Sequence, residues 1–195
     1  MKETMKNLIL AFVGESQARN RYRIYAKIAK REGYELISEV FLATAENEYE
    51  HAKSFFDMFN QLKTASGEKI ETVKLENVDA SVRFGDTIEN LKAAIQGEHE
   101  ENSFLYPKFA QIAEEEGFGA IAKRIRAIAK AEEHHEKRFT NILSELEKDT
   151  LYRKESKVYW VCMECGYIHE GKEPPEICPS CLHSKAFFKL ENEEF

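Results

Sequence analysis

The sequence predicts a mainly α-helical protein: a four-helix bundle with a long crossover connection, followed by a small C-terminal module of strands and cysteine turns. Three observations predict it. Apolar residues recur at helical spacing along four long stretches of the chain before the cysteines. The stretch 63–85 lacks that spacing and is far longer than a turn between neighbouring helices needs. All four cysteines fall within residues 162–181, as two Cys-x-x-Cys pairs.

Two amphipathic helices and the crossover account for the first part of the chain. The first helix is expected over residues 4–31 and is closed by Gly33, because glycine readily takes the left-handed conformation that ends helices. The second helix is expected over residues 34–62. The stretch 63–85 is rich in Ser, Gly, Thr, Asn and Asp, but apolar residues alternate within it. We therefore expect it to cross along the bundle and to pack on its surface.

Two further helices follow the crossover. Asp86 is a suitable N-cap for the third helix, whose apolar pattern continues past Pro107. Because proline has no N–H and its ring clashes with the preceding turn, we expect this helix to bend there. The fourth helix is expected to begin after Gly117 or Gly119 and to end near Lys148.

The chain is expected to contain two domains joined by a charged linker. Residues 1–149 carry the helical pattern, and residues 150–157 form the linker. Within residues 158–195, the segments 158–161 and 186–190 are predicted to be short strands beside the cysteine turns. A module of this size has little room for a core and commonly needs a metal or disulfides for its stability.

Each of the four helices is expected to place acid on its inner face. One such glutamate is usually a boundary residue in contact with solvent, but several buried carboxylates require protons or shared cations. Two helices also carry Glu-x-x-His, whose ends lie on one helix face. Ferritin-like di-iron proteins combine two such motifs with single acids from the other two helices. The residues that predict a site of this kind are Glu15, Glu48, His51, Glu98, Glu101, Glu132 and His135.

Spacing decides which residues near position 132 are candidate ligands. Glu132 and Glu133 are followed by both His134 and His135. The pair 132/135 repeats the spacing found on the second helix, whereas residues 133 and 134 are each rotated by about 100° from their neighbours and are expected to face solvent. Oxygen-rich ligation with two imidazoles suits iron or manganese better than a closed structural zinc site.

The cysteines predict a second metal site. Cys162 and Cys165 form one pair and Cys178 and Cys181 the other, with twelve residues between the pairs. Such turns direct two sulfurs and several backbone N–H groups at one ion, so a tetrahedral four-sulfur site is expected. The spacing of the cysteines does not determine which ion is bound. Zinc would be structural, whereas iron would transfer single electrons.

Composition narrows the remaining possibilities. The net charge is −7, so nucleic acid and anionic membranes are poor partners. No apolar run approaches the length that crosses a bilayer, and the first residues lack the pattern of a signal peptide. We therefore expect a cytoplasmic protein, in which clustered cysteines bind metal rather than form disulfides.

Taken together, the motifs resemble the rubrerythrin family, which joins a ferritin-like di-iron domain to a rubredoxin-like domain. The resemblance covers nearly the whole chain. One departure is Leu182, which stands where family members usually have glycine after the last cysteine, and leucine is expected to strain or reshape that turn. The resemblance rests on Gly14-Glu-Ser-Gln-Ala-Arg-Asn-Arg-Tyr22, Glu48-x-x-His51, Gly97-Glu-x-x-Glu101, Tyr106-Pro107, Ala131-Glu-x-x-His-Glu-Lys-Arg138, Cys-x-x-Cys-Gly-Tyr and Cys-Pro-x-Cys.

The resemblance implies roles for the candidate ligands. Glu48 and Glu132 would bridge two irons. On reduction, the first iron would exchange Glu101 for His51. Before that exchange, the remaining ligands would be Glu15 with Glu101 on the first iron and Glu98 with His135 on the second.

Two tyrosines also belong to the motifs of the family. Tyr22 lies seven residues after Glu15, and Tyr106 five after Glu101. Both tyrosines could donate hydrogen bonds to ligand carboxylates, and both could equally be core aromatic residues.

The resemblance implies a non-haem di-iron peroxidase that reduces hydrogen peroxide to water and protects against oxidative stress. Electrons would return singly through the rubredoxin-type iron from an external donor, a rubredoxin or an NAD(P)H-linked flavoprotein reductase. The chain has no Gly-x-Gly-x-x-Gly sequence, so that reductase is expected to be a separate protein. Because helices of this length span about 40 Å, we expect a homodimer packed head to tail to bring the two kinds of centre together.

Two other functions account for part of the pattern. A ferritin-class ferroxidase or iron-storage protein would explain the bundle but give the cysteines no task. A zinc-ribbon interaction protein carried on a helical bundle would explain the cysteines but not the buried acids.

Overall fold

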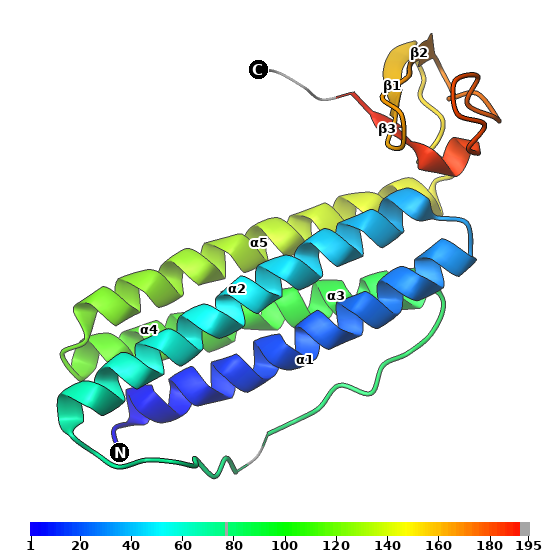
Figure 1. The fold of residues 1–195 in the computed structure, drawn as a ribbon. Coiled ribbons are helices and arrows are strands. Elements are labelled where there is room, and N and C mark those ends of the chain that lie inside the picture. Colours follow the sequence, from blue (N-terminus) through cyan, green and yellow to red (C-terminus); the bar gives the residue numbers. More distant parts are fainter. Residues whose placement is uncertain (77, 192–195) are drawn as a thin grey trace.

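The computed structural model describes residues 1–76 and 78–191. It contains a long helical bundle with a small strand-containing module at one end (Figure 1), which confirms the predicted fold class. No helix in the described residues combines the length and apolar character that crossing a membrane requires. The bundle consists of α1 (Glu3–Arg31), α2 (Glu35–Ser66), α3 (Thr87–Glu100), η1 (Glu101–Leu105), α4 (Tyr106–Glu115) and α5 (Gly119–Glu147).

The helices form two antiparallel pairs linked by the crossover. α1 packs mainly on α2, whereas α3 and α4 pack on α5. The turns within the pairs contain Gly33 (φ +85°) and Gly117 (φ +88°), so both require the left-handed conformation. The crossover then runs along the bundle beside α1 (Figure 1). Ile70 and Val73 pack against the core, as expected for a segment that covers the bundle surface.

The third long helix begins with a strong cap and is interrupted in its middle. Asp86 accepts a hydrogen bond from the backbone N–H of Glu89 (2.8 Å), and Glu89 accepts one from that of Asp86 (3.1 Å). The α-helical pattern of this helix changes at residues 101–105, which form η1, a π-helical segment of five residues. Pro107 follows it in the first turn of α4. Proline is tolerated there because N–H groups in a first turn need no partner in the same helix.

The apolar core consists of two clusters, one toward each end of the bundle. On α1, cluster residues end at Ala11 and resume at Ala18. On α5 they end at Ile128 and resume at Phe139. The predicted acids and histidines occupy these gaps on every helix. The sequence therefore places a polar layer across the middle of the bundle, between two apolar layers.

The C-terminal module is a three-stranded antiparallel sheet of β1 (Val158–Cys162), β2 (Ile168–Gly171) and β3 (Phe188–Leu190), in the order β2-β1-β3. A short 3-10 helix, η2 (Lys185–Phe187), replaces the beginning of the predicted last strand. β2 was not expected from the sequence, because its residues are half-buried or exposed and give no apolar run.

Candidate metal centres

The predicted ligands of the bundle come together in its polar layer. They project from α1, α2, α3, η1 and α5, and most are buried although their side chains are ionisable. Glu15, Glu48, Glu98, Glu132 and His135 are at most 3% exposed, and His51 and Glu101 are partly buried.

Two of these carboxylates belong to two ligand clusters at once. Glu48 of α2 and Glu132 of α5 occur in both clusters, and in each cluster one donor atom of every member lies within 4.8 Å of the others. The shared residues therefore lie between two neighbouring positions for an ion. The first cluster is completed by Glu15 and His51, and the second by Glu98 and His135.

The two oxygens of each shared carboxylate face different histidines. Glu48 Oε2 lies 2.9 Å from His51 Nδ1, and its Oε1 lies 3.2 Å from His135 Nδ1. Glu132 Oε1 lies 2.8 Å from His51 Nδ1, and its Oε2 lies 2.8 Å from His135 Nδ1. A carboxylate whose oxygens are divided in this way has the geometry of a bridge between two ions.

Several donor atoms in the clusters have no hydrogen-bond partner among the described residues. His135 Nδ1 and Glu132 Oε2 approach closely without hydrogen-bond geometry. Such an arrangement is expected where both atoms point at a common cation, since leaving them unpaired in a core is costly. The donor set therefore fits two ions with oxygen-rich ligation, such as iron. The unpaired atoms are Glu15 Oε2, Glu48 Oε1, Glu98 Oε2, both carboxylate oxygens of Glu132, and His135 Nδ1.

Burial changes the protonation of the acids when no cation is bound. Desolvation, reinforced by neighbouring carboxylates, raises the pKa of Glu98 to about 8. Desolvation also raises the pKa values of Glu15 and Glu101 well above the ordinary value for a glutamate. Without metal these side chains therefore hold protons near neutral pH, and metal binding must displace them.

The carboxylate partners of the two histidines raise the histidine pKa values. Burial alone would lower the pKa of His51, but the neighbouring carboxylates of Glu132 and Glu48 raise it to about 9. The same balance, with Glu98 as a further partner, raises the pKa of His135 to about 12. Imidazolium ions thus neutralise the carboxylates when cations are absent, and both must lose a proton to bind metal.

The two motif tyrosines donate hydrogen bonds to candidate ligands. The hydroxyl group of Tyr22 donates to Glu98 Oε1, and that of Tyr106 donates to Glu15 Oε1. All four side chains are buried. Each bond occupies one carboxylate oxygen and leaves the other free to face the clusters. Both tyrosines are therefore core aromatic residues and hydrogen-bond donors at once.

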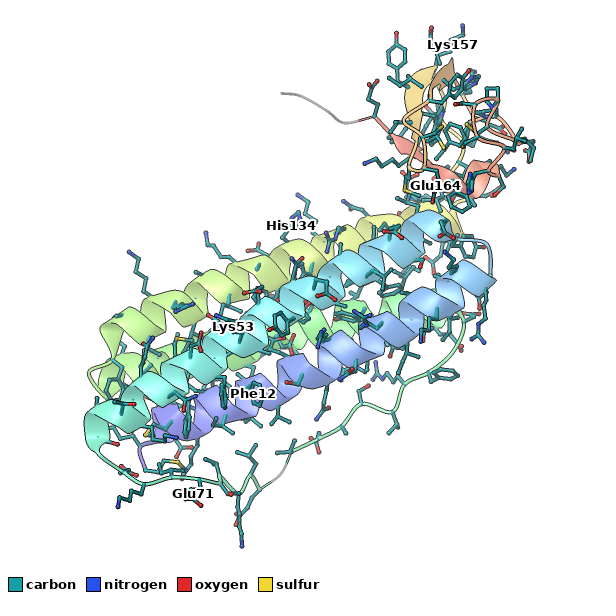
Figure 2. The ribbon with its side chains drawn as sticks, in the orientation of Figure 1. Phe12, Lys53, Glu71, His134, Lys157 and Glu164 are labelled. Carbon is teal, nitrogen blue, oxygen red and sulfur yellow. The ribbon has the colours of Figure 1, made fainter. Side chains whose placement is uncertain are left out.

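Three candidates lie outside the two clusters. Glu101 is partly buried and lines a groove on the side of the bundle. The cluster that contains Glu15 therefore includes His51 and not Glu101. Glu133 and His134 are exposed, and His134 points outward from α5 (Figure 2).

Beside the clusters lies a half-buried cation, Arg138, which was not among the predicted site residues. Arg138 lies one turn after His135, and its Nη2 donates a hydrogen bond of 2.5 Å to Thr44 Oγ1. Desolvation lowers the pKa of Arg138, while the charges of Glu98 and Glu48 oppose that shift. The 135/138 spacing places both residues on one helix face, and the same reasoning that selected 132/135 could have found it.

The four cysteines also converge. Cys162 Sγ lies 3.7 Å from Cys181 Sγ, and Cys165 Sγ lies 3.7 Å from Cys178 Sγ. A tetrahedral site with metal–sulfur bonds of about 2.3 Å requires sulfurs roughly 3.8 Å apart. No disulfide joins these cysteines. The cluster therefore fits one tetrahedral ion.

Leu182 adopts the left-handed backbone conformation that glycine adopts more readily. Its φ is +65°, and its backbone N–H donates to the carbonyl of Cys178 (2.9 Å). A left-handed residue with a side chain costs about 1–2 kcal/mol. The expected strain at this cysteine turn is therefore present, and the turn keeps its shape in spite of it.

His183 is a further residue that the sequence analysis did not single out. Its Nδ1 lies 3.3 Å from Cys181 Sγ. A metal-bound cysteine is a thiolate and can only accept, so the imidazole would donate. Hydrogen bonds to ligand sulfur stabilise the reduced centre, which carries one more negative charge.

Replacing His183 with valine should therefore lower the reduction potential of an iron bound there. A net hydrogen bond of about 1 kcal/mol corresponds to roughly 40 mV for one electron. Spectroelectrochemical titration of the iron-loaded protein measures this change. A variant with Lys185→Ala, which removes a nearby surface charge paired with Glu176, serves as the control. An unchanged potential in the valine variant would contradict the hydrogen bond's role.

These features define a class of protein: a ferritin-like bundle with a carboxylate-rich di-iron site, joined to a four-cysteine, rubredoxin-like module. A family model described as Rubrerythrin matches residues 6–143, and one described as the rubrerythrin rubredoxin-like domain matches residues 160–189. The chain belongs to the rubrerythrin family.

Individual relatives agree over nearly the full length. A putative rubrerythrin of Methanocaldococcus jannaschii is 53% identical, over 100% of this chain and 96% of the relative. The rubrerythrin of Nitratidesulfovibrio vulgaris is 44% identical, over 96% of this chain and 93% of the relative. Among solved structures, nigerythrin in a partially reduced state is similar, with a TM-score of 0.63 and 28% identity over 98% of this chain and 88% of that one.

Proposed function

We propose that the protein is a non-haem di-iron peroxidase that reduces hydrogen peroxide to water as a defence against oxidative stress. The observation that carries this proposal is the pair of carboxylates shared between two ligand clusters, in a chain that also holds a four-sulfur cluster. A two-electron reaction at the first site and a one-electron relay at the second are complementary tasks.

The proposed ligands are those expected from the sequence. Glu48 and Glu132 would bridge, Glu15 would hold the first iron, and Glu98 with His135 would hold the second. His51 and Glu101 would alternate at the first iron as its charge changes. The proximity of His51 to Glu15, with Glu101 outside the clusters, is consistent with the arrangement proposed for the reduced site.

When bound, two ferrous ions would supply the two electrons that the O–O bond needs for its cleavage. The chain's own groups orient the site and manage protons. Tyr106 holds a proton at Glu15 Oε1, and Tyr22 holds one at Glu98 Oε1. These hydrogen bonds keep each carboxylate turned toward its cluster. The apolar layers on either side exclude water from the rest of the core.

Electrons would come from a separate donor, a rubredoxin or an NAD(P)H-linked flavoprotein reductase, through the rubredoxin-type iron. Within one chain, the part of α5 from His135 to the end of this helix at Glu147 alone separates the two sites by about 18 Å. A homodimer packed head to tail would shorten the path. The α1–α2 face offers a suitable surface, because Tyr49 and Phe56 are 44% and 45% exposed there. We place the protein in the cytoplasm, where thiolates stay reduced.

Stoichiometric oxidation by peroxide tests this function. The visible absorption of iron-loaded protein should bleach with a mild reductant, and one equivalent of hydrogen peroxide should reoxidise two ferrous ions of the bundle site. A colourless four-cysteine site that contains zinc would remove the electron relay and favour an interaction protein. Continued uptake of iron as mineral, without peroxide consumption, would instead favour a ferritin-class storage protein.

A further inference from the structure

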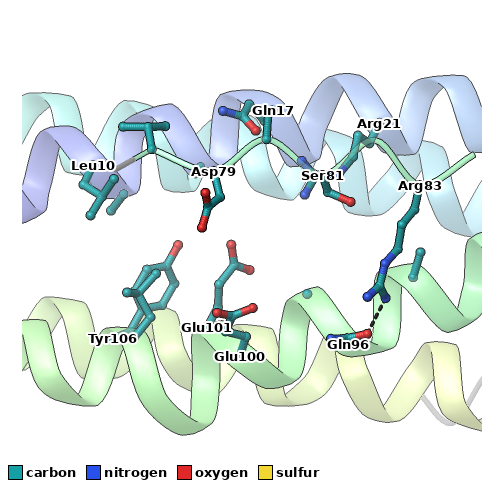
Figure 3. A pocket seen from close by; sticks show the side chains of 17 residues that line it. Leu10, Gln17, Arg21, Asp79, Ser81, Arg83, Gln96, Glu100, Glu101 and Tyr106 are labelled. Carbon is teal, nitrogen blue, oxygen red and sulfur yellow. Dashed lines mark hydrogen bonds between the residues drawn. The ribbon is translucent and has the colours of Figure 1, made fainter. Parts of the chain in front are cut away.

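A groove on the side of the bundle leads to the edge of the proposed metal site. Its volume is about 420 Å³, and its walls come from α1, from α3 with η1, and from crossover residues 78–83. The carboxylate of Glu101 lies inside it, beside Tyr106. Figure 3 shows Leu10 and Tyr106 toward one end, Arg21 and Arg83 toward the other, and Asp79, Glu100 and Glu101 between them.

Two glycines keep this groove open down to Glu101. Gly14 of α1 and Gly97 of α3 both line it. A Cβ at Gly14 would lie 4.0 Å from Glu101 Oε1, and a Cβ at Gly97 would meet nothing within 4 Å. Neither glycine has a positive φ, so no backbone conformation requires them. Glycine inside a helix costs about 1 kcal/mol relative to alanine, which makes the open space a feature maintained at a cost.

The groove is far larger than hydrogen peroxide needs. A water molecule occupies about 30 Å³ in the liquid, so a molecule with two oxygens requires roughly twice that. A volume of about 420 Å³ instead lies in the range of roughly 300–1,000 Å³ that is typical of sites for small organic molecules.

The lining indicates the chemistry of such a molecule. Apolar side chains contribute one part of the wall. The guanidinium groups of Arg21 and Arg83 face the carboxylates of Asp79, Glu100 and Glu101, and Arg83 is held by a hydrogen bond to the neutral Gln96. A groove with one carboxylate in excess repels anionic ligands and accepts an uncharged one. Its apolar members are Leu10, Ala11, Val78, Ala80, Ala93 and Leu105.

We propose that this groove admits small, uncharged organic hydroperoxides as substrates, with the organic group along Leu10, Val78 and Leu105 and the hydroperoxide group at Glu101. The inference rests on the proposed peroxidase function and extends its substrate class. The O–O bond would break with one electron supplied by each of two bound ferrous ions, and two protons from solvent would complete one alcohol and one water. The organic group remains in the groove as part of the alcohol.

Kinetics with two peroxides test the proposal. Wild-type, iron-loaded protein should turn over both hydrogen peroxide and cumene hydroperoxide. Gly97→Leu fills the groove from a position with free space, so kcat/KM for cumene hydroperoxide should fall by about tenfold or more, a usual range for discrimination by shape. Hydrogen peroxide turnover should stay within about twofold. The control variant is Gly119→Leu, because a Cβ at Gly119 also meets nothing within 4 Å and this residue lies outside the groove. It should change neither rate.

Binding of the product provides a readout without turnover. The alcohol formed from cumene hydroperoxide, 2-phenylpropan-2-ol, should bind the oxidised, iron-loaded protein in calorimetry. Gly97→Leu should abolish that binding, and Gly119→Leu should retain it. Ala80→Trp, at an exposed crossover position in the groove wall, should also weaken it and keeps the test independent of any effect of Gly97→Leu on folding.

The possible failures are distinguishable. Protein that reduces neither peroxide would contradict the proposed function itself. Protein that reduces hydrogen peroxide but not cumene hydroperoxide, and that does not bind the alcohol, would overturn the inference about the groove. An equal loss of both activities in folded Gly97→Leu and Ala80→Trp variants would overturn it as well, because the groove would then be a general entrance and not an organic site.

Discussion

Replacing His135 with alanine is expected to leave the bundle with one iron instead of two and to reduce peroxide turnover by more than about 100-fold. His135 is 3% exposed, and its Nδ1 faces oxygens of three carboxylates, at 2.8 Å from Glu132, 3.2 Å from Glu48 and 3.4 Å from Glu98. Among the described residues, His135 is the only histidine in the second cluster, whose other members are carboxylates. Its removal leaves only carboxylates at that position.

The matched variant is His51→Ala, which removes the corresponding histidine of the other motif. In our proposal His51 binds iron only after reduction, when it replaces Glu101. The oxidised His51→Ala protein should therefore keep both irons, while turnover falls. Metal analysis after gel filtration counts the ions, and the reduced and oxidised forms are compared by Mössbauer spectroscopy.

The pair of variants separates a fixed ligand from an exchanging one. Equal loss of iron from both oxidised variants would contradict the exchange of His51 for Glu101, although the di-iron site would stand. Full iron content in His135→Ala would contradict the assignment of the second site. Glu133→Ala, on the exposed side of α5, is the control and should change neither iron content nor rate.

Helical periodicity was sufficient to predict that most of these side chains meet at one level of the bundle. Residues three apart on α2 and α5 had to share a helix face, and the gaps in the apolar pattern placed them at one level. Periodicity could not reveal how each carboxylate divides its oxygens between two histidines, since this depends on side-chain torsions in the assembled core. For the same reason, sequence alone could not decide whether Tyr22 and Tyr106 donate hydrogen bonds.

Some features depended on interactions between distant segments. The π-helical segment η1 begins at Glu101 itself, and proline alone predicted only a bend. The groove that reaches Glu101 needs the crossover as its third wall, and the path of a connection without periodicity cannot be read from the sequence. Leu182 is the opposite case, because the strain expected from a missing glycine is visible directly in its φ of +65°.

Metal removal is expected to make stability fall steeply as pH rises from about 4.5 to 9. The unfolded chain has a glutamate pKa of about 4.3, whereas burial raises the pKa of folded Glu98 to about 8. Between these values the folded state binds a proton that the unfolded state lacks, so a rise in pH destabilises the fold. The raised pKa values of Glu15 and Glu101 act in the same direction.

The histidines add to the same trend. The pKa of His51 is raised to about 9 in the folded protein, against about 6.5 in the unfolded chain. Its contribution to stability is fully present below the unfolded value and is lost as pH rises through the folded one. Glu132 acts oppositely, because its partners lower its pKa, and it loses its contribution only at acid pH. Metal-free protein should therefore be most stable near pH 5.

Thermal unfolding of chelator-treated and iron-loaded protein at pH 5, 7 and 8.5 measures this effect. For a chain of this size each kcal/mol shifts Tm by about 2–4 °C, so metal-free protein should lose about 10 °C or more across the range. Iron-loaded protein should change little above pH 6, because its carboxylates are held in the charged form by the cations. A metal-free protein as stable at pH 8.5 as at pH 5 would contradict the buried, protonated state of these acids.

Glu98→Gln separates the effect of this acid on the stability of the metal-free fold from its contribution to metal binding. Glutamine has the same shape but cannot ionise, so the metal-free variant should unfold at a higher temperature than metal-free wild type at pH 8.5, and at a similar one at pH 5. The iron-loaded comparison should reverse, because the neutral amide is a weaker ligand than a carboxylate. A residue that destabilises the empty fold and stabilises the loaded one is retained for binding the cation. The proposed site therefore depends on its metals for stability as well as for its chemistry.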